Sequence, residues 1–186
     1  MIPAPVHELM KARQADPSAL PVDEGAFFWV DWSEDDDQIP GACEDVLKTG
    51  QLSAEWIDDG LAIVWRGERT LVPLKVSIAS RLSDSFLFSS IAWAIPFSLG
   101  NFLPWLSREN RDITLRTLNQ VLLPDYEIRR VVDPAQASEA AYLPLRREAW
   151  QALEEQYGSG FLATVFAPIG SLAATDDGSA APSAEG

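Results

Sequence analysis

The sequence predicts an α+β domain: a mostly antiparallel sheet of about five to six strands, with helices packed on one face. Two observations support this class. Several segments alternate apolar and polar residues and follow one another through short turn signals, which is typical of antiparallel strands. Two other segments repeat apolar residues at helical spacing. With 186 residues, 47% of them hydrophobic, the chain is long enough for one well-filled core and short for two domains.

The first predicted strand is rich in aromatic side chains. Because side chains alternate along a strand, Phe28, Val30 and Trp32 are expected on one face. Trp29 and Asp31 are expected on the other. The acidic run that follows this strand favours the start of a helix, since carboxylates stabilise the exposed N–H groups of a first turn.

Turn signals predict that the next strands form a meander. Asp58, Asp59 and Gly60 are a strong signal for a short hairpin. A second turn is indicated at residues 66–69. The strands expected around and after these turns are residues 52–57, 61–65, 70–74, 126–132 and 140–145.

The clearest helix is predicted at residues 108–123, where Ile113, Leu115 and Leu118 recur at helical spacing and Pro124 ends the pattern. Three more helices are expected: residues 6–14, a helix that starts at Ser33 and has its body at 43–48, and residues 147–157. The apolar segment 161–169 is predicted to be either a helix or a strand.

The chain is expected to contain an N-terminal helix and link (1–20), the α+β domain (21–169), and a small, polar, disordered tail (170–186). Within the domain, residues 85–107 contain no charged side chain. Three interpretations of this stretch stay open: a buried hairpin or helix, an exposed docking surface, or a membrane span, against which its prolines argue. Its candidate docking side chains are Phe86, Phe88, Trp93, Phe97, Phe102 and Trp105.

The net charge is −14, and the negative charge is concentrated in the N-terminal third. Up to Gly60 there are 14 acidic and 3 basic residues, against 14 and 11 in the remainder. Such a field repels nucleic acid and attracts basic partners, although acidic surfaces also serve solubility alone. The candidate partner-binding face consists of Asp31, Glu34, Asp35, Asp36, Asp37, Glu55, Trp56, Asp58 and Asp59.

Residues that carry catalysis or hold cofactors are scarce. His7 is the only histidine and Cys43 the only cysteine, so neither a zinc site nor an internal disulfide is expected. The acidic run does not match a calcium-binding loop, whereas a glycosidase-type pair of carboxylates needs only spatial proximity and stays open. We expect no enzyme activity, cofactor, metal or nucleic-acid partner. The N-terminus shows no secretory signal, which favours the cytoplasm.

Three stretches are distinctive as a set: 28–34, 110–129, and 142–145 followed by Trp150, Leu153, Glu154, Tyr157 and Gly158. Together they resemble a group of small acidic proteobacterial proteins. Some of these look like immunity proteins carried beside secreted toxins of the type VI secretion kind. The resemblance rests on core and turn residues, so it implies no functional residue. The sequence departs from that pattern in the uncharged stretch 85–107.

The sequence therefore favours a non-catalytic binding protein, an immunity or antitoxin inhibitor that covers a toxin or effector with a basic surface. Trp29, Trp56 and Trp65 are candidate aromatic anchors, with core packing as the alternative for each. A second hypothesis is an adaptor or chaperone that holds a partner on residues 85–107. A third is membrane association through the same residues. A hydrolase built on carboxylates is the last.

Overall fold

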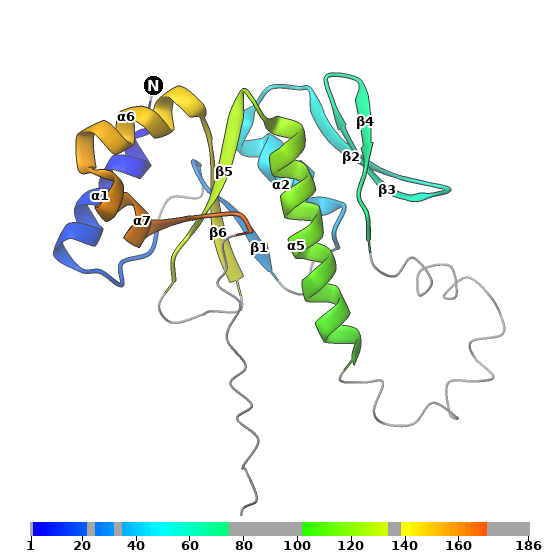
Figure 1. The fold of residues 1–186 in the computed structure, drawn as a ribbon, viewed down its shortest axis with the longest axis horizontal. Helices are drawn as coiled ribbons and strands as arrows, with labels where there is room; N and C mark the ends of the chain where they lie inside the picture. Colours follow the sequence, from blue (N-terminus) through cyan, green and yellow to red (C-terminus); the bar gives the residue numbers. More distant parts are fainter. Residues whose placement is uncertain (1, 22–24, 32–34, 75–101, 134–138, 171–186) are drawn as a thin grey trace, which may run out of the picture.

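The computed structural model describes residues 2–21, 25–31, 35–74, 102–133 and 139–170, and it confirms the predicted α+β class (Figure 1). The helices are α1 (Ala4–Ala15), α2 (Gln38–Leu47), α5 (Phe102–Leu122), α6 (Arg147–Tyr157) and α7 (Ser159–Val165). The strands are β1 (Phe28–Asp31), β2 (Leu52–Ile57), β3 (Gly60–Trp65), β4 (Glu68–Leu71), β5 (Tyr126–Val131), β6 (Glu139–Arg146) and β7 (Phe166–Pro168). They form two antiparallel sheets, of order β1-β6-β5-β7 and β2-β3-β4.

The four-stranded sheet is apolar on both faces. In β6, Ala140 and Tyr142 belong to one core, and Ala141 and Leu143 belong to the other. Helices α2 and α5 cover the first face, while α1, α6 and α7 cover the second (Figure 1). The structure therefore corrects the prediction that α5 and α6 pack on one face. A central strand that is buried on both sides needs a helical layer on each.

The three-stranded sheet is a meander of two hairpins, and the turn between β2 and β3 is the predicted one. Arg66 and Gly67 join β3 to β4, and both have positive φ (53° and 82°), which is the conformation of a tight two-residue hairpin turn. Because Trp65 pairs with Glu68 directly across this turn, β4 begins at Glu68 and not at the predicted Thr70.

Two helix starts also differ from the predictions. Helix α5 begins at Phe102, earlier than the predicted Arg108. The prediction missed these first turns because the residues before Arg108 are mostly apolar, so they do not show the polar face that marks a helix in the sequence. Helix α2 begins at Gln38, after a turn in which Gln38 N donates to Asp35 O at 3.0 Å. The final apolar segment contains both a helix, α7, and a strand, β7.

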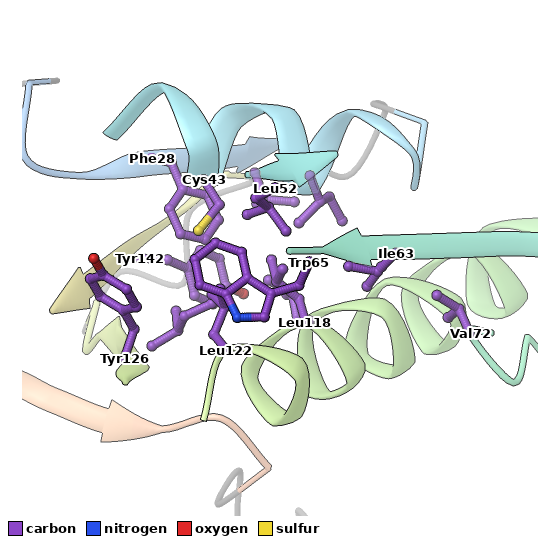
Figure 2. Packing of buried hydrophobic residues seen from close by; sticks show 14 of the residues in the cluster. Phe28, Cys43, Leu52, Ile63, Trp65, Val72, Leu118, Leu122, Tyr126 and Tyr142 are labelled. Atoms are coloured by element: carbon purple, nitrogen blue, oxygen red, sulfur yellow. The ribbon is translucent and has the colours of Figure 1, made fainter. Parts of the chain in front are cut away.

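The larger core lies between the two sheets, around α5 (Figure 2). Leu118 and Leu122 of α5 are fully buried there. Trp65 of β3 packs edge-on against Tyr126 of β5, with ring centroids 6.1 Å apart, and this contact joins one sheet to the other. Trp65 is only 8% exposed, so one of the three candidate anchor tryptophans is a core residue.

The second core lies between the four-stranded sheet and α1, α6 and α7. Trp150 of α6 donates from Nε1 to the carbonyl of Glu127 at 2.8 Å, and the guanidinium of Arg129 lies 4.3 Å from the centre of its ring. His7 Nδ1 and the Tyr157 hydroxyl are hydrogen bonded at 3.0 Å, which ties α1 to α6. The N-terminal helix is therefore part of this core.

Several sequence-based predictions fall outside the described residues. They concern Trp32, Glu34, the uncharged stretch up to residue 101 with Phe86, Phe88, Trp93 and Phe97, and the tail from residue 171. Phe102 and Trp105 belong to the first turns of α5, where the structure describes the backbone. Among the helices of the described ranges, none combines the length and the apolar character that crossing a bilayer requires.

We expect Leu118→Ala to lower the free energy of unfolding by about 3 kcal/mol, because it removes a fully buried side chain from the core shared by both sheets. The matched control is Leu123→Ala, which changes a residue that directly follows α5 and is 41% exposed. Its cost should stay below about 0.5 kcal/mol. Urea unfolding followed by tryptophan fluorescence measures both variants, and equal losses would contradict the central place of α5 in the core.

Candidate functional site

The turn before α2 meets the far end of the β2–β3 hairpin. The indole Nε1 of Trp56 donates a hydrogen bond to Asp37 Oδ2 at 3.0 Å. This contact joins two acidic segments that are well separated in the sequence, because α2 packs along β2. We refer to the residues that it brings together as the Trp56 surface: Asp35, Asp36, Asp37, Trp56, Ile57, Asp58 and Asp59.

Trp56 is 51% exposed, whereas Trp65 is in the larger core and Trp29 packs half-buried against the second core. Strand pairing places Trp56 opposite Leu61, on the face of the three-stranded sheet that carries the core residues. It stands, however, at the end of the hairpin, where half of its surface stays in solvent. Of the three candidate anchors, Trp56 is therefore the one available to a partner.

Two further apolar residues at this end of the molecule were missed by the sequence analysis. Ile57 and Leu71 are 39% and 47% exposed. Both lie on the outer face of the three-stranded sheet. Gly60 connects them: it pairs with Ile57, and a Cβ placed on Gly60 would be 3.8 Å from Leu71 Cδ1. Alternation along β2 was the available signal, because it sets Ile57 on the face opposite to the buried Leu52.

Asp36 has the least favourable environment among these acids. Burial raises the pKa of its carboxyl to about 6, against the attraction of Arg111 on α5, and the charges of Asp35 and Asp37 add to the rise. Asp36 Oδ1 is buried and accepts no hydrogen bond from the described residues. At neutral pH the fold therefore holds an ionised carboxylate at a cost in stability, a situation that is frequent at functional surfaces.

The other residues of the predicted acidic face differ in their exposure, their ion pairs and the side of the molecule on which they lie. Glu55 lies on the outer face of the three-stranded sheet and forms an ion pair of 2.5 Å with Arg69. Asp58 and Asp59 form the exposed turn between β2 and β3. Asp31 ends β1, with its side chain on the face of the four-stranded sheet opposite to α2. The structure thus separates Asp31 from the Trp56 surface.

The chemistry that the Trp56 surface offers is recognition. Carboxylates accept hydrogen bonds from guanidinium and ammonium groups, and the face of an indole ring attracts cations as well as apolar side chains. Within the described ranges, no three residues among His, Cys, Asp and Glu gather closely enough to hold a metal ion. Basic and apolar groups are the chemical complement of carboxylates and an indole ring.

We predict that Asp36→Asn stabilises the protein at neutral pH and not in acid. The pKa of Asp36 is about 6 in the folded protein and near 4 in the unfolded chain. Between these values the folded state binds more protons, so wild-type stability falls as the pH rises through about 6. At about pH 7.5 the variant should gain about 1 kcal/mol, after allowance for solvent screening.

Urea unfolding of both proteins at about pH 4 and about pH 7.5 measures this effect. The control is Asp45→Asn, which removes an exposed carboxylate from α2 and should change stability little at either pH. A gain of equal size at both pH values would show that the effect does not come from ionisation of Asp36.

Comparison of the chain with protein-family models, with curated proteins and with solved structures found no significant match. The Trp56 surface combines a half-exposed indole, an exposed acidic turn and a partly buried carboxylate.

Proposed function

We propose that this protein is a non-catalytic binding protein that docks onto another protein through the Trp56 surface. One observation carries the proposal: a half-exposed tryptophan, hydrogen bonded to Asp37 and bordered by acidic side chains. The proposed mode of action is occlusion, in which an immunity or antitoxin inhibitor covers a basic site on a toxin or effector. The sequence resemblance to immunity proteins supports this mode, and the cytoplasm is the proposed compartment.

Trp56 can supply a large part of the binding free energy. A tryptophan side chain buries on the order of 200 Å² in an interface, and tryptophan is enriched among the residues that dominate binding. The hydrogen bond to Asp37 already restricts the ring, so less conformational entropy is lost when a partner covers it. Ile57 and Leu71 expose further apolar area on the opposite face of the same sheet.

The carboxylates around Trp56 favour a basic partner. Asp58 and Asp59 are exposed, and Asp35 and Asp37 raise the pKa of Asp36 by their negative charge. A lysine or arginine of a partner placed here would offset this repulsion and stabilise the ionised Asp36. Opposite charge also speeds diffusional encounter, an effect that salt weakens.

The first test is Trp56→Ala. The tagged protein is used to recover its partner from cells that encode both, and the affinity for the identified partner is then measured by calorimetry. We expect the variant to bind at least about 30-fold more weakly, as for loss of an interface anchor worth about 2 kcal/mol. Leu20→Ala is the control, because it also removes an exposed apolar side chain, 38% exposed in a different part of the chain.

An unchanged affinity of Trp56→Ala would contradict the proposal. If the partner is instead an unfolded chain or a membrane fraction, and its recovery does not depend on Trp56, the alternative is favoured. In that alternative the protein is an adaptor, a chaperone or a membrane-associated protein that acts through residues 85–107.

The second test concerns charge. We expect the double variant Asp58→Lys, Asp59→Lys to associate with the partner about tenfold more slowly at low salt, and the difference should shrink as salt is added. Glu148→Lys, Glu155→Lys makes the same change in net charge on exposed positions of α6. Stopped-flow association of both double variants separates a local effect from a change in total charge. Equal slowing by the two would leave the acidic turn with no special role.

A further inference from the structure

Strand β4 is an open edge of the three-stranded sheet (Figure 1). Helix α2 packs along β2, at the other edge. Among the described helices and strands, β3 is the one that packs along β4. All residues of β4 (Glu68–Leu71) are exposed to solvent. An exposed edge strand offers backbone groups with which another strand can pair.

The strand register identifies the free backbone groups of β4. Val72 N donates to Leu61 O at 2.8 Å, which makes these two residues a hydrogen-bonded pair. Such pairs alternate along an antiparallel ladder, so Thr70 also directs its N–H and C=O groups toward β3. The N–H and C=O groups of Arg69 and Leu71 therefore point away from β3. No hydrogen bond among the described residues uses them.

Two features limit the free edge to these two positions. Before Arg69 the chain turns at Gly67, whose φ of 82° is left-handed and not extended. The next outward position after Leu71 is Pro73, which has no N–H group. An incoming strand can therefore use the donors and acceptors of Arg69 and Leu71, which are placed symmetrically about Thr70.

We propose that this edge binds a second copy of the chain, with the two β4 strands antiparallel about a two-fold axis at Thr70. In this register Arg69 of each copy pairs with Leu71 of the other, and every free backbone group forms a hydrogen bond. A shift of the register by two residues brings in Gly67 or Pro73 and loses hydrogen bonds. A second copy fits because it carries the same short edge, so the contact closes on itself.

The side chains of β4 are compatible with this pairing. Thr70 would lie opposite Thr70 of the second copy, which is a favourable cross-strand pair. Leu71, 47% exposed, would lie against the aliphatic part of Arg69 of the second copy. Within each chain the Arg69 guanidinium is paired with Glu55 at 2.5 Å. Glu68 and Arg69 make β4 itself neutral, and in this register no two like charges lie directly opposite each other.

The strength and the salt dependence of this dimer follow from its size and charge. A contact made mainly by two short strands is small, so we expect a Kd on the order of 0.1–1 mM. Each copy has a net charge of −14, so salt should tighten the dimer by screening the repulsion. Salt should have the opposite effect on a basic partner at the Trp56 surface. The inference does not depend on the function of that surface.

The first test is disulfide trapping of the full-length protein with diamide, which accepts the electrons and protons of the thiols. Thr70→Cys places two thiols at a non-hydrogen-bonded pair, where Cα atoms about 4.5 Å apart permit a disulfide. Glu68→Cys is the matched control, because it is exposed on the same face of β4 but lies opposite Val72 of the second copy. We expect Thr70→Cys to be trapped as a dimer at least about tenfold faster. The native Cys43 is buried.

The second test is sedimentation equilibrium without an oxidant. Leu71→Lys should weaken the dimer at least about tenfold, because it sets a lysine opposite Arg69 of the second copy. Ile57→Lys makes the same charge change on the same sheet face, on β2 and away from the β4 edge, and should leave the dimer intact. Equal weakening by both variants would indicate a contact through the sheet face and overturn the proposal.

Two further outcomes would also overturn it. One is a wild-type protein that stays monomeric at about 1 mM in high salt. The other is trapping of Thr70→Cys and Glu68→Cys at equal rates.

Discussion

The arrangement of both sheets depends on the burial of one side of α5. Leu115, Leu118 and Leu122 are inaccessible to solvent, and they belong to a core that receives side chains from both sheets. Both sheets bury apolar residues in the core that contains α5, and an apolar sheet face needs another layer to cover it. The edge-on contact of Trp65 with Tyr126 lies in the same core, so one packing arrangement positions the hairpin relative to the rest of the molecule (Figure 2).

The position of the hairpin determines which aromatic residues are presented to solvent. The core buries Trp65 at one end of the meander, while Trp56, at the other end, stays half exposed although its cross-strand neighbour Leu61 is buried. There Asp37, from the turn before α2, holds the indole by a hydrogen bond. The same turn places Asp36 partly out of water, beside two like charges. The ionised Asp36 lowers the stability of the fold, while Trp56 and the nearby carboxylates form an exposed surface. Proteins commonly tolerate such a loss of stability at functional sites.

Two neighbouring arginines, Arg129 and Arg130, lie on opposite faces of β5 and have different surroundings. On the α6 side, Arg129 is held by Glu127, Glu154 and the ring of Trp150, and it serves the packing of the second core. On the α5 side, Arg130 reaches the end of the core, where α5, β6 and β7 leave a small recess. The two arginines are neighbours in the sequence. Strand alternation separates them, and only the identity of the elements on each face shows that their surroundings differ.

Local patterns in the sequence were sufficient for the fold class, the β2–β3 hairpin, the body of α5 and the alternation of Phe28 and Val30 in β1, because these depend on neighbours a few residues apart. The resemblance to immunity proteins and the non-catalytic function stay predictions. The tertiary structure alone decided that helices cover both faces of the larger sheet. It also decided that Trp65 is buried and Trp56 exposed, although both lie in strands of the same hairpin. The physical reason is that exposure depends on which distant element packs over a strand. Neither strand propensity nor hydrophobic periodicity contains that information.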